Sequence, residues 1–571
     1  MNFVTPSGFR DVLVEEATRR ERITAAVRDL FARRGYAPIE TPTLEVMDVM
    51  RAGGRVPGTP FKFFDAQGEL LAMRPDVTLQ IARMVATRYA GVEGPLRFRY
   101  TQRVFREAEG DQQAMARELT QVGIECIGEE GPKADAEVIG LLADALECAG
   151  VRGFRLAIAT VGVLRALLAR SGAPAPWQAQ VLAAYHASNF VELDRLTDPA
   201  FLASDREALG TAPACAAAIR ALPRIHGGRE AIERVRALAT PLGCLDDLDG
   251  FEASYDILCE RGLEQAILVD FSVMSSFDYY TGIVFEAYAP TLGAPLGSGG
   301  RYDNMIAAYG TPRPAAGFAF YLEQAMAAAD VPAAAFAEPR ALRIAVPKGS
   351  LNADTIAALA RAGLDVEGLA DPGRQLVISN PGVDYIIVRP TDAPTFVALG
   401  AADCGICGKD SLVEADSGVV ELVDLGFGGC RFVVAEPAGA REAIEARYRA
   451  RGSIRVATKY PNITRAFYAQ RGDEVEVVKL HGNIELAPLT GMAERIVDIT
   501  ATGTTLRENN LVVVDEVMAS TARFFANECA FRTDARIVAL AETLQETASI
   551  ALAADTENPA GTAPAAEATK E

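Results

Sequence analysis

Apolar and polar positions follow two different patterns along the 571 residues of the chain. In the second part, short β-branched runs such as 342–346 (LRIAV), 384–388 (DYIIV) and 454–458 (IRVAT) predict strands, because Val and Ile favour extended backbone. Stretches with helical spacing follow several of these runs, for example 352–363 (NADTIAALARAG). Strands that alternate with helices predict an α/β domain with a parallel sheet, whose ligands bind at the carboxyl ends of the strands.

The first part of the chain has longer amphipathic stretches. Residues 15–35 (EEATRRERITAAVRDLFARRG) predict a helix with one apolar face. Apolar runs at 61–65, 97–100 and 283–288 are separated by long segments and predict strands of an antiparallel sheet. We therefore expect an α+β domain here, with helices packed on an antiparallel sheet.

Composition predicts where these domains begin and end. Residues 329–340 are rich in Ala and Pro and are typical of a linker. We therefore expect one domain over residues 1–328 and a second over residues 341–553. The last residues, 554–571, contain few large apolar side chains, so we expect a disordered tail.

Overall composition excludes several classes of protein. Half of the residues are hydrophobic and 23% are charged, which is typical of a soluble globular protein. No apolar run is long enough to span a membrane, and the first residues do not resemble a secretion signal, so we expect a cytoplasmic protein. The formal net charge of −20 argues against general nucleic-acid binding, although local groups of Lys and Arg can still bind an anionic substrate.

The nine cysteines are scattered, and several lie in apolar runs, as expected for reduced thiols in a cytoplasm. Cys404 and Cys407 form the one close pair. No second pair and no histidine lie near them, so two small residues in a strand are a better interpretation than a zinc site.

Residues 497–506 (VDITATGTTL) combine features of a binding site. An apolar strand carries Asp498, and Gly503 allows a tight turn before a short helix. The free N–H groups and hydroxyls of such a turn suit a phosphate, whereas Asp498 would repel it and suits the hydroxyls of a sugar. The combination fits a ribose 5-phosphate. An ordinary strand–turn–helix connection without a ligand is the alternative.

The wider context of this stretch resembles a known family. Glu485, Gly491, Asp498 and the TGTTL of 502–506 stand in the spacing seen in the short form of ATP phosphoribosyltransferase. The resemblance covers about residues 341–550 and includes the motifs PKGS (347–350), RPTDAPTFVALGAADCGICGKD (389–410) and ATKYPNITRAFY (457–468). Ser350 is a departure, because Arg often stands there.

This resemblance implies a fold and a reaction. The fold is a two-lobed α/β domain like that of periplasmic binding proteins. The reaction joins N1 of ATP to C1 of phosphoribosyl pyrophosphate (PRPP) and releases pyrophosphate, in the first step of histidine biosynthesis. N1 carries no proton to remove, so fixed positive charge and Mg²⁺ on the phosphates matter more than a general base. A two-lobed module that binds without turnover is the alternative.

The resemblance also implies which residues form the site. Asp498 would bind the ribose hydroxyls. The 5-phosphate would lie against Thr500, Ala501, Thr502, Gly503, Thr504 and Thr505. The ATP-binding residues would be Arg389, Asp392, Asp403 and Lys409. The catalytic residues would be Lys348, Lys459 and Glu485. For each basic residue a solvated surface side chain is the alternative, and the metal ligands are unknown.

The first part resembles class II aminoacyl-tRNA synthetases, and histidyl-tRNA synthetase in particular. The motifs that carry this resemblance are 35–45 (GYAPIETPTLE), 104–107 (VFRE), 117–125 (RELTQVGIE), 278–286 (DYYTGIVFE), 299–303 (GGRYD) and 316–324 (AGFAFYLEQ). Gln324 and Ser275 stand where the family has arginines that serve adenylate formation, and no anticodon-binding domain follows. We therefore expect neither tRNA charging nor tRNA as a partner.

The amino-acid pocket of that family is still polar in this chain. By resemblance, Asp76, Thr78 and Gln121 would face the amino group of free histidine. Glu125 and one of Tyr279 and Tyr280 would face the imidazole ring. The alternative is that these residues only support a core that has lost its ligand.

The two resemblances fit together on one chain. Short-form transferases work with a separate regulatory subunit that resembles histidyl-tRNA synthetase, and here a linker joins the two at a one-to-one ratio. We therefore expect L-histidine, the end product of the pathway, to inhibit the transferase. We also expect a homo-oligomer, with a tetramer favoured, because both parts belong to families that pair with themselves.

Overall fold

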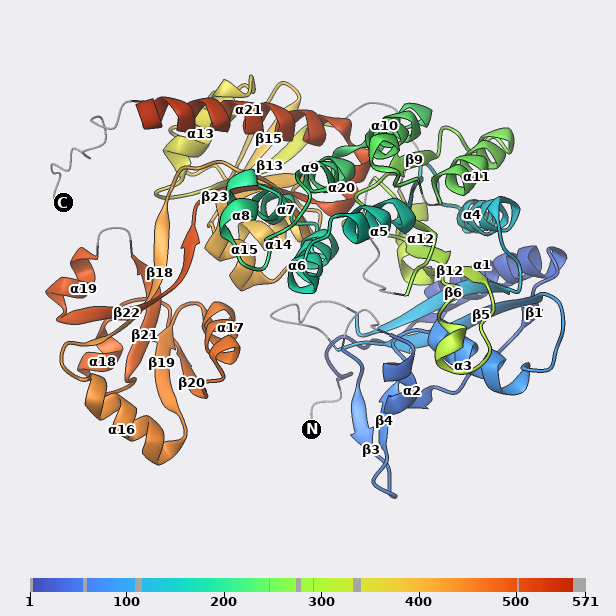
Figure 1. Cartoon of the computed structure of the whole chain (residues 1–571), viewed down its shortest axis with the longest axis horizontal. Helices are drawn as coiled ribbons and strands as arrows, with labels where there is room; N and C mark the ends of the chain where they lie inside the picture. The colour runs from blue at the N-terminus through green and yellow to red at the C-terminus, as the bar shows by residue number, and fades with distance from the viewer. Residues whose placement is uncertain are drawn as a thin grey trace. The chain divides into compact units, whose positions relative to one another are not determined.

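The computed structural model describes residues 4–54, 59–107, 116–245, 247–273, 279–290, 292–331, 340–500 and 503–557, with side chains to residue 550. The chain forms two compact units (Figure 1). Unit 1 comprises Met1–Arg340 and Glu528–Asp534, and unit 2 comprises Ala341–Asn527 and Ala535–Glu571. Each unit is described by itself.

Unit 1 is built on a nine-stranded sheet with the order β1-β5-β6-β12-β11-β10-β7-β9-β8. In chain order its strands are β1 (Ala37–Pro38), β5 (Leu96–Phe105), β6 (Glu118–Ile127), β7 (Arg155–Thr160), β8 (His226–Gly227), β9 (Ile267–Asp270), β10 (Ile283–Tyr288), β11 (Gly297–Arg301) and β12 (Ala315–Tyr321). Most neighbours are antiparallel, as predicted, but β1–β5 and β7–β9 are parallel pairs. The β7–β9 pair is parallel because a long helical segment separates the two strands in sequence.

A second, three-stranded antiparallel sheet contains β2 (Leu44–Val46), β4 (Leu70–Met73) and β3 (Lys62–Phe64) in that order. The strand predicted at residues 61–65 therefore belongs to this small sheet and not to the main one.

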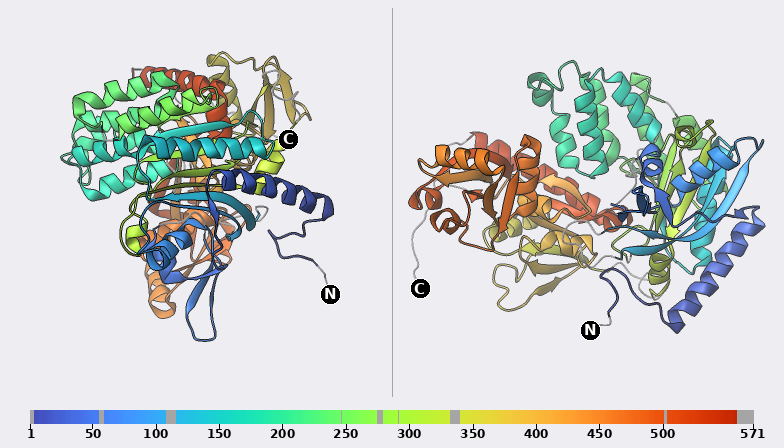
Figure 2. Two further views of the ribbon diagram at one scale, coloured as in Figure 1. Left: turned by 90° about the vertical axis from the view of Figure 1, so that its right-hand side faces the viewer. Right: turned by 90° about the horizontal axis from the view of Figure 1, so that it is seen from below.

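Helices α1 (Val14–Arg33) and α4 (Pro132–Cys148) pack against each other and contact strands of the nine-stranded sheet, and Figure 2 shows α1, in dark blue, lying along it. The buried residues of α1 are Ile23, Val27 and Phe31, and their spacing of four places them on one face of the helix, as the sequence predicts. The other helices of unit 1 are α2 (Met47–Ala52), α3 (Thr78–Arg88), α5 (Val161–Arg170), α6 (Ala175–His186), α7 (Phe190–Leu196), α8 (Pro199–Ser204), α9 (Pro213–Ala221), α10 (Arg229–Ala239), α11 (Leu248–Glu260), α12 (Leu322–Ala329) and α20 (Glu528–Thr533).

Unit 2 contains two sheets. The six-stranded sheet has the order β14-β15-β13-β16-β23-β17, and the five-stranded sheet has the order β20-β19-β21-β18-β22. In chain order the strands are β13 (Leu342–Pro347), β14 (Val377–Asn380), β15 (Val383–Val388), β16 (Cys404–Gly408), β17 (Val419–Asp424), β18 (Cys430–Pro437), β19 (Ile454–Thr458), β20 (Val475–Lys479), β21 (Arg495–Thr500), β22 (Leu511–Ser520) and β23 (Ala522–Asn527).

Both sheets are mixed, so the prediction of a parallel sheet is wrong for part of each. Parallel pairing joins β13 to β15 and β16, and β19 to β20 and β21. Strands β18 and β23 pair antiparallel with their neighbours. The physical reason is connectivity: β17 leads to β18, and β22 to β23, directly from one sheet to the other, so β18 and β23 do not enter their sheets through the strand–helix–strand units that produce parallel pairs.

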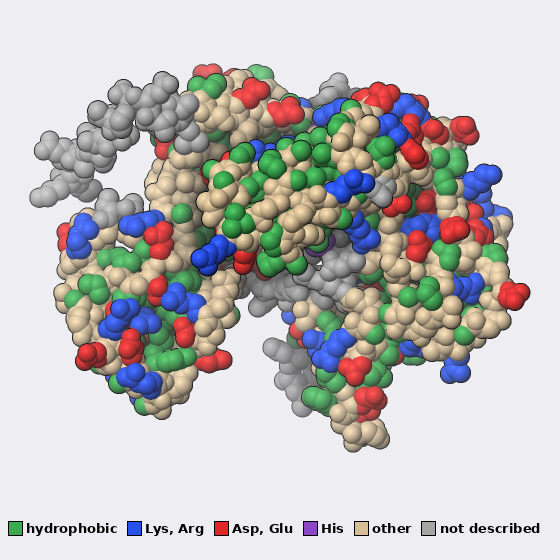
Figure 3. All heavy atoms as spheres, in the orientation of Figure 1, with side chains coloured by type: hydrophobic (Ala, Val, Ile, Leu, Met, Phe, Trp, Pro, Cys, Tyr) green, Lys and Arg blue, Asp and Glu red, His purple; other side chains and the backbone are tan. Residues whose placement is uncertain are grey.

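The helices of unit 2 are α13 (Asn352–Arg361), α14 (Ala393–Ala398), α15 (Lys409–Ala415), α16 (Arg441–Arg451), α17 (Pro461–Arg471), α18 (Leu486–Leu489), α19 (Thr504–Glu508) and α21 (Ala535–Glu557). Apolar clusters around Val434 and Ile496 form the core of the five-stranded part. On the face of this part that Figure 3 shows, Lys and Arg side chains are interspersed with Asp and Glu. The net negative charge of the chain therefore does not gather into one patch there.

The predicted boundaries fall close to the ends of elements. Helix α12 ends at Ala329, where the predicted linker begins, and residues 332–339 of that linker lie outside the described residues. Helix α21 continues to Glu557, so the first residues of the predicted tail are helical, whereas 558–571 lie outside the description. Among the helices of the described residues, none combines the length and apolar character that crossing a membrane requires.

Candidate functional site

The described residues of the stretch 497–506 form a strand and a short helix, which confirms these two parts of the local prediction. Strand β21 ends at Thr500 and α19 begins at Thr504. Gly503 has φ +72°, a left-handed conformation that favours glycine, and its N–H donates to Thr500 Oγ1 at 2.8 Å. The side chain of Arg507 donates to Thr504 Oγ1 at 3.1 Å, which brings a cation to the turn. Two of the predicted phosphate contacts, Ala501 and Thr502, lie outside the described residues.

Asp498 lies on β21 beside two other predicted site residues. Thr458 of β19 pairs in parallel with Val497, so Lys459 and Asp498 each follow one member of this pair at the carboxyl end of the strands. Burial raises the pKa of Asp498 to about 6; the N–H of Ile499 opposes this shift, Glu485 adds to it and Lys459 opposes it. The structure thus brings Lys459, Glu485 and Asp498 together.

A second group of predicted residues follows the parallel strands of the six-stranded sheet. Lys348 follows β13 and Arg389 follows β15, and both side chains are exposed. The N–H of Lys348 donates to the carbonyl of Val388 at 2.8 Å, which ties the two strand ends together. Asp392 is exposed and immediately precedes α14. These side chains are therefore at the carboxyl edge of the sheet and open to solvent.

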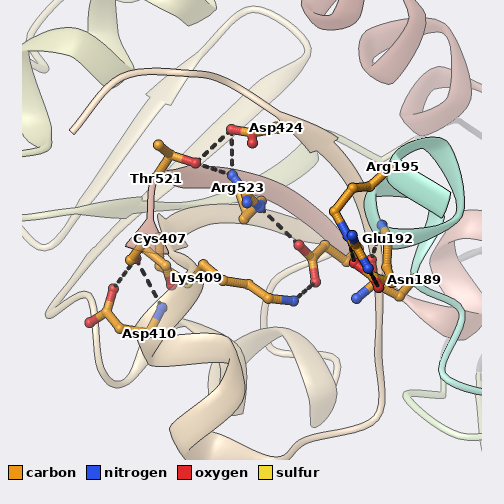
Figure 4. A network of polar contacts seen from close by, with 12 residues as sticks. Asn189, Glu192, Arg195, Cys407, Lys409, Asp410, Asp424, Thr521 and Arg523 are labelled. Carbon is orange, nitrogen blue, oxygen red and sulfur yellow. Dashed lines mark hydrogen bonds and ion pairs between the residues drawn. The ribbon is translucent and has the colours of Figure 1, made fainter. Parts of the chain in front are cut away.

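Lys409 belongs to an ionic network at the same edge (Figure 4). Its Nζ atom pairs with Glu421 of β17, and Arg523 Nε of β23 donates to the other oxygen of that carboxylate at 2.9 Å. Arg523 also pairs with Asp424 and Thr521. Two cations therefore share Glu421, and the charge of Lys409 is largely compensated.

Asp403 does not join this group. It is 2% exposed and precedes β16, at the amino end of the parallel strands. Its carboxylate accepts hydrogen bonds from the N–H and the guanidinium of Arg343, at 2.8 and 3.0 Å. The structure therefore does not bring Asp403 together with the other residues predicted to bind ATP, and its bonds tie β13 to the start of β16.

The six residues predicted to bind histidine line one cavity in unit 1, together with Ser298, Gly299, Tyr302, Gly317, Phe318, Ala319 and Tyr321. Thr78 begins α3 and Asp76 lies two residues before it. Gln121 and Glu125 come from β6, where their spacing of four places both on one face. Tyr279 and Tyr280 precede β10. A side chain on Gly317 would collide with Glu125, its partner across the β6–β12 pair, so this glycine leaves room for the carboxylate.

Glu125 is the centre of a buried hydrogen-bond network. Thr78 Oγ1 donates to it at 2.7 Å, Tyr100 at 3.4 Å, and Tyr302 donates to the second carboxylate oxygen. Burial raises the pKa of Glu125 to about 8, although the hydrogen bonds from Tyr302 and Thr78 lower it. Burial therefore favours the neutral form of this carboxyl group when the cavity holds no cation.

The other end of the cavity presents acceptors. Asp76 accepts from the N–H of Thr78 at 2.7 Å and from Gln121 Nε2 at 3.2 Å. Gln121 Oε1 is buried, and no donor among the described residues reaches it. A buried acceptor without a donor is costly, and an ammonium group would satisfy it.

The cavity has about 20 Å³ of free volume, which is room for about one water molecule. An amino acid would enter only if side chains of the lining moved. The sequence analysis missed Tyr302 and Tyr100 as lining or neighbouring groups, although Tyr302 stands inside the GGRYD motif that carried the resemblance. Ser275 and Asp278, which it singled out, lie outside the described residues.

Comparison with known proteins matches the two parts of the chain to two different families. Residues 8–325 match the family described as Histidyl-tRNA synthetase, and residues 389–546 match the family described as ATP phosphoribosyltransferase. An ATP phosphoribosyltransferase of Moorella thermoacetica is 51% identical over 215 residues, which cover 36% of this chain and 93% of that protein. The ATP phosphoribosyltransferase regulatory subunit of the same organism is 38% identical over 325 residues, which cover 57% of this chain and 81% of that protein.

A crystal structure of an ATP phosphoribosyltransferase regulatory subunit/histidyl-tRNA synthetase from Bacillus halodurans aligns with a TM-score of 0.53 and 28% identity, covering 68% of this chain and 99% of that one. The fold and the matches define a phosphoribosyl-transferring enzyme fused to a synthetase-like part. The chain belongs to the ATP phosphoribosyltransferase family, with its regulatory part first and its catalytic part second. It is a pentosyltransferase that forms phosphoribosyl-ATP in the first step of histidine biosynthesis.

Proposed function

We propose that the substrates of this transferase bind at the carboxyl edges of the two sheets of unit 2. PRPP would lie at Asp498 and the 500–505 turn, and ATP would lie near Lys348, Arg389, Asp392 and Lys409. The strand crossings from β17 to β18 and from β22 to β23 support a two-lobed domain of the periplasmic-binding-protein type. The observation that carries the proposal is the group of Lys459, Glu485 and Asp498 around a glycine turn.

Each residue has a physical task in this arrangement. An ionised Asp498 accepts hydrogen bonds from the ribose hydroxyls, and the turn donates N–H groups to the 5-phosphate. N1 of ATP attacks C1 of the ribose with its lone pair while the bond from C1 to pyrophosphate breaks and the electron pair leaves with pyrophosphate. Lys459 and Lys348 supply positive charge where the leaving group gains negative charge.

The carboxylates of Glu485 and Asp498 fit a Mg²⁺ site that is completed by substrate. Mg²⁺ usually takes one or two protein carboxylates together with phosphate oxygens and water. Burial is the main cause of the raised pKa of Asp498 and the charge of Glu485 adds to it, so a cation beside both carboxylates would stabilise the ionised form of Asp498. When bound, Mg²⁺ would neutralise charge on the departing pyrophosphate.

Steady-state assay of Asp498→Ala tests the catalytic site. Loss of this acceptor should lower kcat/KM for PRPP by at least about 100-fold while the fold stays intact. Asp515→Ala is the matched control, because Asp515 lies in the same part of unit 2 and forms a half-exposed ion pair with Arg471. Unchanged pyrophosphate release by Asp498→Ala would reject the assignment.

We also propose that the cavity of unit 1 binds L-histidine and that binding slows the transferase. Asp76, Thr78 and Gln121 would hold the ammonium group, and Glu125 with Tyr279 or Tyr280 would hold the imidazole. The buried acceptor Gln121 Oε1 supports this orientation, because an ammonium would supply the missing donor. Inhibition requires that histidine bind one conformation better than another, and the small free volume supports an opening of the cavity on binding.

Histidine titration of Glu125→Ala and Gln121→Ala tests this site. Both variants should need roughly 5- to 150-fold more histidine for half-inhibition, a range that corresponds to typical allosteric coupling, and turnover without histidine should not change. Glu118→Ala is the control, since Glu118 lies on the same strand but forms a surface ion pair with Arg103. If both cavity variants keep the inhibition of the unmodified enzyme, histidine binds elsewhere.

We further propose that the protein works in the cytoplasm as a homo-oligomer, with a tetramer favoured. None of the nine cysteines, all of which lie in the described residues, forms a disulfide, which supports a reducing compartment. Families that resemble each half pair with themselves, which supports a closed assembly.

A further inference from the structure

Helix α20 belongs to the transferase by sequence and to unit 1 by packing. Its residues, Glu528–Thr533, lie inside the segment that matches the ATP phosphoribosyltransferase family. The compact unit that contains them is nevertheless unit 1, while the preceding Asn527 and the following Ala535 belong to unit 2. The chain therefore enters unit 1 a second time, far from the linker at 329–340.

Apolar contacts hold α20 in the core of unit 1. Cys529 is fully buried and belongs to the same apolar cluster as the strands of the nine-stranded sheet. Phe531 is 7% exposed and meets Phe190 of α7 edge to face, with ring centroids 6.0 Å apart. In Figure 1, α20 is coloured red and lies among green helices of unit 1.

A buried cation adds specificity to this packing. Arg532 lies 3.5 Å from the carboxylate of Asp270 at the end of β9, an ion pair without hydrogen-bond geometry, and 3.1 Å from Glu528. Its guanidinium lies over the ring of Tyr288 on β10, 5.1 Å from the centroid. Burial by itself lowers the pKa of Arg532, but Tyr288, Glu528 and Asp270 outweigh it and keep the group charged. Removing one partner would leave the other charges buried and unpaired, which is strongly unfavourable.

We propose that α20 is an anchor that binds the core of unit 1 independently of the linker, although its sequence belongs to the transferase. The anchor residues are Cys529, Phe531 and Arg532, and their receptor in unit 1 is formed by Phe190, Asp270 and Tyr288. Because α20 directly continues β23, an inner strand of the six-stranded sheet, force on the anchor acts on the strand that carries Arg523.

The anchor also lies close to the cavity within unit 1, and this step rests on the proposed histidine site. Tyr288 donates to Glu286 on β10, and Glu286 pairs across the sheet with Ser298, which lines the cavity. Strand β11 carries Ser298, and the neighbouring strand β10 carries Tyr288, which contacts Arg532. A shift of β11 on histidine binding would therefore reach Tyr288 through β10.

Cleavage of the linker in the folded, full-length protein tests the anchor. A protease site placed within residues 332–339 is cut under native conditions, and the products are separated by size-exclusion chromatography at micromolar concentration. The two fragments of the unmodified chain should elute together, whereas those of Arg532→Met should separate because their affinity falls by at least about 100-fold. Arg449→Met, at an exposed position of α16, is the matched control and should stay together. Separation of the unmodified fragments, or full retention in Arg532→Met, overturns the proposal.

A second measurement decides the question if Arg532→Met does not fold. In the intact, unmodified protein, hydrogen exchange of residues 529–533 should be as slow as that of β9 and β10, and exchange at the rate of an exposed helix overturns the anchor. The proposed connection between the cavity and Arg532 has its own test, which uses the Arg532→Met protein with its linker intact. Histidine should still bind by calorimetry but inhibit less. If histidine fails to bind the unmodified protein, the proposed histidine site is wrong. The cleavage experiment does not use histidine and still tests the anchor.

Discussion

At the scale of single residues, the surroundings of a carboxyl group decide what it does in this protein. Asp403 is buried and fully engaged by Arg343, so it serves the structure. Burial raises the pKa of Asp498 to about 6 and its acidic neighbour Glu485 adds to this rise, while the one backbone N–H that bonds it opposes the rise. A ligand that brings hydroxyl donors or a metal ion would stabilise the ionised form of such a partly buried carboxyl group.

The raised pKa of Asp498 predicts a pH dependence. The ionised form accepts the ribose hydroxyls, so kcat/KM for PRPP should fall as pH drops through about 6, by about tenfold between pH 7 and pH 5. Glu485→Gln removes a negative neighbour, which lowers the pKa of Asp498 and moves the break in the profile to lower pH, even where maximal turnover is reduced. A profile of kcat/KM from pH 5 to 8 measures both. A break that stays in place or moves upward in Glu485→Gln would contradict the assignment.

At the scale of elements, helix α17 shows how a partner replaces a missing local signal. The helix begins at Pro461, and its preceding residue, Tyr460, makes no side-chain cap. Instead, the carboxylate of Glu414, on α15, accepts from the N–H groups of Asn462 and Ile463 at 3.0 and 3.1 Å. The acid thus satisfies two orphan donors at the positive end of the helix and ties α15 to α17.

Loss of this cap should destabilise the catalytic part. Glu414→Ala leaves two N–H groups without their acceptor and should lower the free energy of unfolding by about 1–2 kcal/mol. Denaturant unfolding followed by circular dichroism measures the change. Glu442→Ala, an exposed acid in the first turn of α16, should change stability by less than about 0.5 kcal/mol. Equal effects of the two substitutions would show that the contact of Glu414 with α17 is not stabilising.

At the scale of the whole molecule, two compact units share one polypeptide that crosses between them three times, near residues 340, 527 and 534. A fusion fixes the ratio of regulatory to catalytic parts at one to one and raises their effective concentration. With self-pairing at both parts, dimers joined in two ways would close into a larger assembly.

The expected assembly is a homotetramer. Light scattering coupled to size-exclusion chromatography should give four times the chain mass of 60.8 kDa at working concentration. A mass equal to one chain would reject self-association. A mass of two chains would show that only one of the two parts, regulatory or catalytic, pairs with its copy.

The sequence by itself determined the local elements and indicated which residues to expect at the sites. Periodic apolar positions predicted α1 and the strands β13 and β21, because these elements depend on spacings within a few residues. The motif residues Asp498 and Gly503 predicted the strand and the turn for the same reason, and the resemblance identified the six side chains that meet around one cavity.

Only the tertiary structure decided what depends on partners far away in sequence. The antiparallel course of β18 and β23, the pairing of Lys409 with Glu421 and the cap of α17 by Glu414 all follow from long-range contacts. Helix α20 is the clearest case, since its sequence matches the transferase but the buried pair of Arg532 with Asp270 places it in the regulatory unit. Local pattern carries no information on which distant surface will bury a side chain, because burial and charge pairing are properties of the folded whole.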